Sequence, residues 1–387
     1  MQERRAPSEQ ALLNLIQSRQ ATSQVELARS LRVPANTVHG IVRRLLEEGV
    51  IVESNAERRG RGRPHKHFQI RIAGPILTIT VSGTEWQSAI VTDPSVPFEV
   101  SVLRASRVPD RTLAMEWFAR IRDMAVEAGG IRVGDLRGAM VHVRRPSTTR
   151  RSSVMPWVAE LDEAVCTEVL GVRTLVSRDV SSEHLELCRW SREGVRSVVV
   201  FNVGDGVSAH YAAHVGPWAE LQTLPGEVGH VVVDPGGARC GCGQRGCLET
   251  LLSGRAVVDR VRAELQKGVR SQLAPFVDLP PVEFFNQLEA LEAGDDLAHR
   301  TVEELLRRCA WGIGTTSNLF CPDLTVLRGY VLFGRQDWLN RIAAALPGVA
   351  LRLKEEYPPL AFSRLESRDL LRELASEFFL RSRANGN

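Results

Sequence analysis

The sequence has 387 residues, 43% hydrophobic and 25% charged, which is typical of a globular protein with two or three domains. Because no apolar run approaches the ~18 residues of a membrane span, and the N-terminal residues lack the pattern of a secretory signal, we expect a cytoplasmic protein. The net charge is +3, but residues 1–70 carry 11 Arg and one Lys against seven Glu, which predicts a polyanionic partner for that segment.

Residues 1–71 are predicted to form a winged helix-turn-helix domain. Apolar spacing indicates a helix over 8–19, a capping box of Ser23 and Glu26 opens a second helix, and a third helix follows over 34–48. A short strand follows the third helix and another ends the segment, as in a wing. The third helix exposes side chains that can reach base edges and phosphates, namely Asn36, Thr37, His39, Arg43 and Arg44.

The segment between the two wing strands, residues 57–66, is rich in arginine. Its residues 62–64, Gly-Arg-Pro, resemble an AT-hook core, which would place Arg61 and Arg63 in an AT-rich minor groove. Alone, such a charge run is equally compatible with a solvated loop. Its position directly after a helix-turn-helix favours contact with double-stranded DNA.

Residues 72–387 are predicted to form an α/β body of two lobes, with mixed sheets covered by helices on both faces. Strands are expected at 76–81, 88–92, 98–103, 140–143, 175–177, 197–203, 207–214 and 324–328. Helices are expected over 112–128, 180–192, 248–265, 281–293, 298–316, 336–346 and 368–381.

One imidazole and three thiols are concentrated within 18 positions of this body. They predict a closed tetrahedral zinc site, formed by His230, Cys240, Cys242 and Cys247. The intervening glycines let the backbone fold around an ion. A full coordination shell indicates structural rather than hydrolytic zinc. The remaining thiols lie on apolar elements, where we expect core positions: Cys166, Cys188, Cys309 and Cys321.

The stretch that holds these ligands resembles the signature of the ROK family of repressors, open reading frames and sugar kinases. The pattern stands here as Glu227-Val-Gly-His230, followed by Cys240-Gly-Cys-Gly-Gln-Arg-Gly-Cys247-Leu-Glu249. The resemblance implies a two-lobed, actin-like (ribonuclease H-like) ATPase fold with a sugar in its cleft. Its small lobe would comprise about 72–180 and a C-terminal helix of about 366–387, and its large lobe about 181–365. A winged helix-turn-helix ahead of this fold is the arrangement of the repressor branch.

The resemblance also implies sugar contacts at Glu227, His230 and Glu249. One nitrogen of His230 would bind zinc, and the other would face a sugar hydroxyl, since metal ligation fixes the tautomer. Carboxylates suit a polyol because they accept hydrogen bonds from neighbouring hydroxyls.

The cleft position at which family kinases carry Asn-Asp-x-Asn reads Arg178-Asp179-Val-Ser. Asp179 would be the catalytic base of a kinase and a simple sugar contact in a regulator. Arg178 either favours an anionic sugar or pairs internally with an acidic neighbour. The loop between 143 and 157 carries four Arg, which suit a solvated loop or a further anion contact.

The phosphate-binding motifs of family kinases are degenerate in this sequence. Residues 80–84 lack the expected carboxylate and one glycine, and residues 204–210 lack two glycines and introduce Asp205, a like charge toward a nucleotide. Residues 327–329 place an arginine where backbone should approach adenosine. Together these losses predict that the protein does not turn over ATP.

The sequence therefore predicts a DNA-binding transcriptional regulator, specifically a repressor of carbohydrate genes that responds to a sugar or sugar derivative. The resemblance implies a homodimer or a higher homo-oligomer. Two alternatives stay open: an ATP-dependent sugar kinase with an attached DNA-binding domain, and a repressor controlled by a protein partner. An activator role also stays open, because DNA binding itself has no sign.

Overall fold

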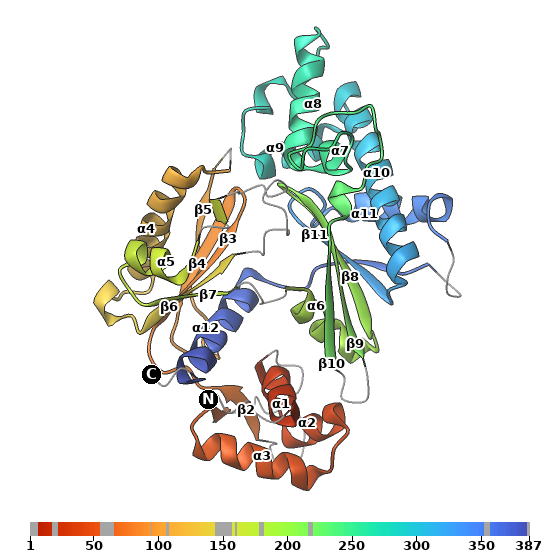
Figure 1. The fold of residues 1–387 in the computed structure, drawn as a ribbon. Helices are drawn as coiled ribbons and strands as arrows, with labels where there is room; N and C mark the ends of the chain where they lie inside the picture. The colour runs from red at the N-terminus through yellow and green to blue at the C-terminus, as the bar shows by residue number, and fades with distance from the viewer. Residues whose placement is uncertain are drawn as a thin grey trace.

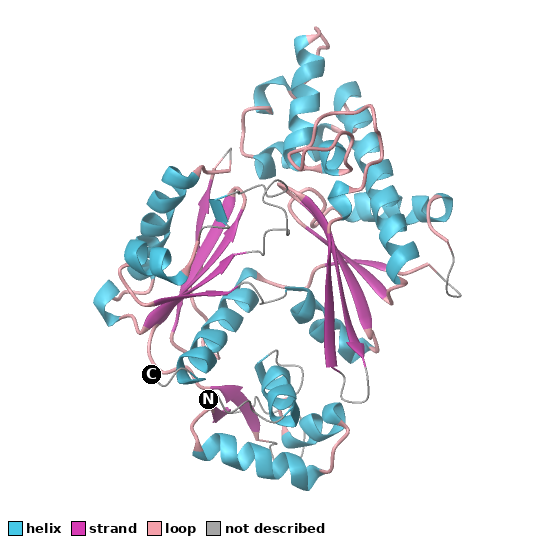
Figure 2. Cartoon of the chain, viewed as in Figure 1, coloured by secondary structure: helices cyan, strands magenta, loops and turns pink. Residues whose placement is uncertain are grey.

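The computed structural model describes residues 7–17, 22–54, 66–93, 95–105, 108–143, 157–158, 161–177, 182–215, 220–351 and 357–384. Two α/β lobes stand side by side, and a small N-terminal domain lies below them in Figure 1. Helices lie on both faces of each large sheet, as Figure 2 shows. Among the described residues, no helix is both long and apolar enough to cross a membrane.

The N-terminal domain is the expected winged helix-turn-helix. The predicted capping box is present. The Ser23 hydroxyl accepts a hydrogen bond from the Glu26 amide, and the Glu26 carboxylate accepts one from the Ser23 amide. Leu12, Leu13 and Ile16 of the first helix are buried. The strands of the wing are antiparallel, and residues 55–65 between them, with Arg61 and Arg63, lie outside the described residues. The elements are α1 (Pro7–Gln17), α2 (Gln24–Leu31), α3 (Ala35–Glu47), β1 (Ile51–Ser54) and β2 (His67–Ile70).

The first lobe contains a five-stranded sheet in the order β5-β4-β3-β6-β7. The central strand β3 is antiparallel to β4 and parallel to β6. α4 and α5 cover one face over a cluster of aromatic rings around Trp86, and α12 covers the other face. The elements are β3 (Ile76–Ser82), β4 (Glu85–Val91), β5 (Ser101–Arg104), α4 (Arg111–Ala128), β6 (Gly138–Val143), α5 (Glu163–Leu170), β7 (Thr174–Ser177) and α12 (Ser367–Ala384).

The second lobe repeats this plan. Its sheet has the order β10-β9-β8-β11-β12, with β8 antiparallel to β9 and parallel to β11. α7 to α11 form the larger core on one face, and α6 packs on the other. The elements are α6 (Ser182–Trp190), β8 (Ser197–Val203), β9 (Val207–Val215), β10 (Glu220–Gly226), α7 (Glu249–Leu252), α8 (Gly254–Gln266), α9 (Pro281–Leu291), α10 (Asp296–Phe320), β11 (Leu324–Arg328), α11 (Gln336–Ala345) and β12 (Leu360–Phe362).

Equal strand order and sense in the two sheets give the duplicated, actin-like arrangement, so the predicted fold class is confirmed. The numerical lobe boundaries stay a prediction. Parallel neighbours such as β3 and β6 require a crossover connection, and α4 supplies it in the first lobe. Short 3-10 helices complete the two lobes: η1 (Val133–Asp135), η3 (Ser191–Glu193), η4 (Val228–His230), η5 (Ala274–Phe276) and η6 (Leu346–Gly348).

The last helix, α12, contacts both the first lobe and the N-terminal domain. Phe378 packs into the first-lobe core, whereas the next residue, Phe379, belongs to the core of the winged helix-turn-helix. Arg383 donates hydrogen bonds to the carbonyl groups of Glu48, at 2.6 Å, and Gly49, at 3.3 Å, where α3 ends. α12 thus fixes the C-terminal end of α3 to the body.

Several sequence expectations differ from the structure. The predicted helix over 248–265 is two helices, because Ser253 is extended and caps the start of α8. α5, β10 and β12 were not predicted; β10 contains Pro225 and Gly226, residues that normally argue against a strand. Cys166, Cys188 and Cys309 are buried as expected, but Cys321 is only half-buried, since it caps the end of α10 in a left-handed conformation.

Candidate functional site

The four predicted metal ligands converge beside η4 and α7 of the second lobe. The ligand atoms of His230, Cys240, Cys242 and Cys247 all lie within 4.8 Å of one another. The Cys240 Sγ lies 3.5 Å from the His230 Nδ1, and the Cys242 Sγ lies 3.6 Å from the Cys247 Sγ. The structure therefore brings together the whole set that the spacing predicts.

The donor set fits a tetrahedral metal ion. Ligand distances of ~2.0–2.3 Å place neighbouring ligand atoms roughly 3.5–3.8 Å apart, which matches the two measured separations. Burial raises the pKa of Cys240, and burial together with the neighbouring thiols raises the pKa of Cys247 to about 12. A bound cation would offset this by stabilising the thiolates. These four residues can hold a metal ion.

The loop that carries the thiols folds back on itself through backbone contacts. The Gly246 carbonyl accepts from the amides of Val233, at 2.8 Å, and Asp234, at 3.1 Å. Gly246 has a φ of +67°, and a Cβ there would lie 1.4 Å from the Asp234 carbonyl oxygen. Gly243 also has a positive φ, of +96°, but a Cβ there would meet nothing within 4 Å.

These two glycines provide a matched pair of substitutions. We expect Gly246→Ala to lower metal affinity by about 10–100-fold, because the loop must move to remove the clash and the support of the ligands is lost. Gly243→Ala introduces only backbone strain, roughly 1–2 kcal/mol, and should retain the metal. Metal content and competition with a chelator measure the difference. Equal affinity in the two variants would contradict the role assigned to Gly246.

His230 lies between the metal cluster and two carboxylates, those of Glu227 and Glu249. Its Nδ1 faces Cys240, whereas its Nε2 lies 3.8 Å from the Glu227 Oε2. Glu249, the first residue of α7, accepts a hydrogen bond of 3.0 Å from the amide of Val207. Burial raises the pKa of Glu249. The hydrogen bond from Val207 and the charge of His230 act to lower this pKa, whereas the charge of Glu227 acts to raise it. Glu227, His230 and Glu249 therefore form one group, as the sequence predicted, while their role as sugar contacts stays a prediction.

The recognition helix α3 presents its predicted side chains to solvent. Asn36, Thr37, His39 and Arg43 are exposed, and Arg43 pairs with Glu47 on the same helix, at 2.8 Å. Arg44 differs, because its guanidinium contacts Glu9 of α1, whose side chain is buried. Its charge is thus partly neutralised within the domain, and its contact with DNA stays a prediction.

Known protein families match both parts of the chain, the N-terminal domain and the two-lobed body. A winged helix-turn-helix DNA-binding family matches residues 6–52. The ROK family model matches residues 155–367, more than half of the chain, including the metal ligands and both carboxylates. The chain belongs to the ROK family. The family resemblance inferred from the sequence is confirmed.

Similar proteins include regulators of the ROK family. The DNA-binding transcriptional dual regulator NagC of Escherichia coli is 32% identical over 146 residues, which are 38% of this chain but only 35% of NagC. The DNA-binding transcriptional repressor Mlc of the same species is 25% identical over 341 residues, 81% of this chain and 78% of Mlc. The solved structure of a ROK family transcriptional regulator, a homolog of Mlc, shares the fold with a TM-score of 0.66 and 19% identity over 98% of this chain and 99% of that one.

Two further ROK positions singled out in the sequence, Arg178 and Asp179, lie outside the described residues, as does the whole arginine-rich segment 144–156. The residue before them, Ser177, ends β7 and donates from its hydroxyl to Glu377 of α12 at 2.8 Å. The end of the strand that leads to Asp179 is thus held by α12.

The two segments that align with phosphate loops of ROK kinases, residues 80–84 and 204–210, contact each other in this structure. The Asp205 carboxylate accepts a hydrogen bond of 2.7 Å from the amide of Thr84 in the opposite lobe. The ring of Tyr330 lies over Gly204 and Gly254, so that a Cβ on Gly254 would be 2.2 Å from the Tyr330 hydroxyl. The degeneracy of the motifs predicted Asp205 as a repulsive charge; the contacts with Thr84 and Tyr330 were not predicted.

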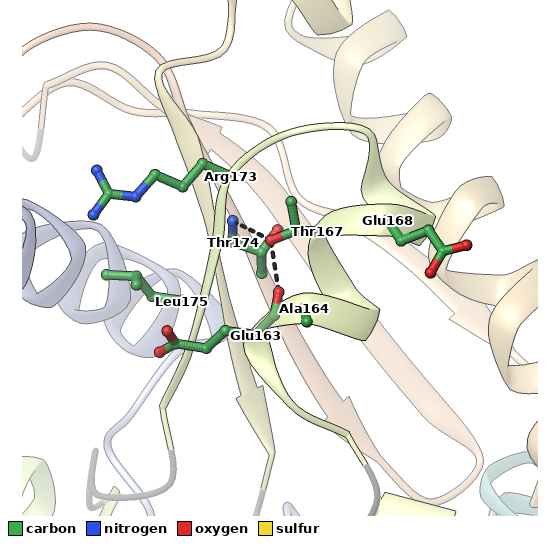
Figure 3. A pocket seen from close by; sticks show the side chains of 7 residues that line it. All are labelled: Glu163, Ala164, Thr167, Glu168, Arg173, Thr174 and Leu175. Carbon is green, nitrogen blue, oxygen red and sulfur yellow. Dashed lines mark hydrogen bonds between the residues drawn. The ribbon is translucent and has the colours of Figure 1, made fainter.

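A surface hollow of about 540 Å³ lies apart from the ROK signature residues, between α5 and β7 (Figure 3). Its central polar group, the Thr167 hydroxyl, donates to the Glu163 carbonyl at 2.6 Å and accepts from the Thr174 amide at 3.0 Å. Glu163 also pairs with Arg381 of α12. Because these groups already bind one another, we assign no ligand to the hollow.

Proposed function

We propose that this protein is a sugar-responsive transcriptional regulator that represses carbohydrate-utilisation genes. The observation that carries the proposal is the combination, in one chain, of an exposed recognition helix with a ROK body that retains Glu227, His230 and Glu249 around a metal-binding cluster. The similarity to the regulators NagC and Mlc supports the same function.

The operator is double-stranded DNA, contacted by α3 and by the wing. Asn36, Thr37, His39 and Arg43 are exposed on one helix and can reach base edges and phosphates in a major groove. Arg61 and Arg63 of the wing would enter the adjacent minor groove. Since these contacts include several guanidinium–phosphate pairs, operator affinity falls as salt concentration rises.

The metal is zinc, in a structural role. Three thiolates and one imidazole form a donor set that zinc prefers, and they complete a tetrahedral shell, which leaves no position for a reacting water. The ion would hold the loop that carries His230 and would fix the orientation of its second nitrogen toward the effector.

The effector is a sugar or sugar derivative bound near Glu227, His230, Glu249 and Asp179, with Arg178 available to an anionic group. The protein does not turn over ATP: Asp205 brings a negative charge into a degenerate phosphate loop and accepts from Thr84, and Tyr330 packs over Gly204 of the same loop. The active assembly is a homodimer, in which the spacing of two winged domains sets the separation of the operator half-sites. Sugar binding changes that spacing and lowers operator affinity.

Fluorescence anisotropy tests the proposal with labelled DNA from upstream of the protein's own gene at fixed salt. The complex is then titrated with glucose, glucosamine, glucuronate and glucose 6-phosphate, which represent neutral, amino, acidic and phosphorylated sugars. We expect one class to release the DNA, and ATP with that sugar to yield no ADP.

Each other outcome identifies a different function. Tight binding that no sugar disturbs would favour control by a protein partner. Sugar-dependent release of ADP would establish a kinase, and the absence of specific DNA binding would overturn the repressor assignment.

A further inference from the structure

Two turns from opposite lobes meet through the side chain of Asp205. This residue lies in the turn between β8 and β9, and Thr84 lies in the turn between β3 and β4. The Asp205 Oδ2 accepts from the Thr84 amide at 2.7 Å, and the Thr84 hydroxyl lies 3.1 and 3.2 Å from the two carboxylate oxygens. One carboxylate therefore accepts both hydrogen-bond donors of Thr84.

The second lobe holds the same carboxylate from its other side. The hydroxyl of Tyr330, just beyond β11, donates to the Asp205 Oδ1 at 2.9 Å. Burial and the charge of Asp205 raise the pKa of Tyr330, so its hydroxyl remains a donor. Hydrogen bonds to an ionised acceptor are stronger than those between neutral groups. Both oxygens of Asp205 are thus engaged, and the carboxylate links the two lobes.

The two turns are shaped for this contact. Gly83, which precedes Thr84, has a φ of +40°, and a Cβ there would lie 1.7 Å from the Asp205 Oδ2. Any other residue at position 83 would displace the carboxylate. Thr84 itself is buried. The contact is therefore a built junction between the lobes rather than an incidental surface pair.

The same turn also reaches the predicted effector site. Val207, two residues after Asp205, donates its amide to the Glu249 Oε2 at 3.0 Å. η4, which carries His230, packs against this strand, since a Cβ on Gly229 would lie 2.3 Å from the Val207 carbonyl oxygen. Glu249 and the residue before His230 thus both contact Val207, which lies two residues after Asp205 of the junction.

We propose that Asp205, Thr84 and Tyr330 form an inter-lobe clasp that holds the lobes at the separation seen in this structure and transmits effector binding to it. The clasp itself rests on the contacts described above. Its coupling to an effector rests, in addition, on the proposed function. The test therefore measures the two parts separately.

The first measurement is hydrogen–deuterium exchange of the full-length protein without DNA or sugar. We expect Asp205→Ala to increase exchange of the Thr84 amide by about tenfold or more, since it loses a hydrogen bond to a charged acceptor. Tyr330→Phe should give a smaller increase. The matched control is Tyr211→Phe, because Tyr211 stacks on Phe320 within the second lobe and should leave Thr84 unchanged. Circular dichroism verifies that each variant is folded.

Small-angle X-ray scattering complements the exchange measurement. Asp205→Ala should increase the radius of gyration, because the lobes separate, whereas Tyr211→Phe should match the wild type. Unchanged exchange at Thr84 together with an unchanged radius in Asp205→Ala would overturn the clasp.

The second measurement is the sugar concentration at which half of the labelled operator is released. If the lobe arrangement held by the clasp is the one that binds the sugar, Asp205→Ala should raise this concentration by about tenfold, again the equivalent of one hydrogen bond to a charged group. An unchanged midpoint in a variant with faster Thr84 exchange would overturn the coupling. If the wild-type protein releases no operator with any sugar, the proposed function fails, while the exchange and scattering results still decide whether the clasp exists.

Discussion

A Cys247→Ser variant is expected to be purified without a stoichiometric metal ion and to unfold well below the wild-type temperature. Cys247 is fully buried at the start of α7, and its thiol is one of four converging ligands. A serine hydroxyl does not ionise to replace a thiolate, and the free energy of binding a structural ion is also folding free energy. A loss of at least ~3 kcal/mol corresponds to about 10 °C for a lobe of this size.

Elemental analysis and differential scanning calorimetry measure these two effects. Cys309→Ala is the matched control, since Cys309 is equally buried but lies in the core of α10, away from the cluster. It should retain one metal ion per chain and lose only the stability of a small cavity, about 1 kcal/mol. A Cys247→Ser protein with full metal content would contradict the proposed ligand set.

The second large effect is expected at the joint between α12 and the N-terminal domain. Phe379→Ala should destabilise the winged helix-turn-helix by about 2–4 kcal/mol, because it removes a buried ring from that small core. The domain should then melt separately from the body, and operator affinity should fall, since α3 loses its fixed position. Calorimetry and limited proteolysis after residue 71 detect the separation, and fluorescence anisotropy gives the affinity.

The neighbouring residue provides the control. Phe378→Ala also removes a buried ring, but from the first-lobe core, where it packs against Gly138. It should destabilise the body and leave the N-terminal domain attached. If Phe379→Ala and Phe378→Ala gave the same melting profile, α12 would not be the element that holds the winged domain.

The sequence identified most elements whose signals are local. The Ser23–Glu26 capping box, the apolar strand at 197–203 and the four metal ligands each depend on short-range spacing, and the structure contains all three. The family signature then implied the duplicated fold, which no short-range pattern specifies.

The contacts that were missed all join residues distant in the sequence. Asp205 and Thr84 are 121 positions apart, and Arg383 and Glu48 are 335 apart, so no periodicity could pair them. A local signal existed for the first pair, since Gly83 and Thr84 are retained in a phosphate loop that has lost its carboxylate and one glycine. β12 was missed for a related reason: it is three residues long and forms only by pairing with β11.

The course of the chain determines how the two lobes can move. The chain passes from the first lobe to the second between β7 and α6, and returns between β12 and α12, so two covalent joints connect the lobes. Two connections at separate points favour rotation about the line through them over sliding of one lobe past the other, which is the geometry of a hinge. α12 begins at one joint and ends against α3. A small rotation at the hinge therefore displaces the exposed side chains of α3, which are far from the axis, by a larger distance.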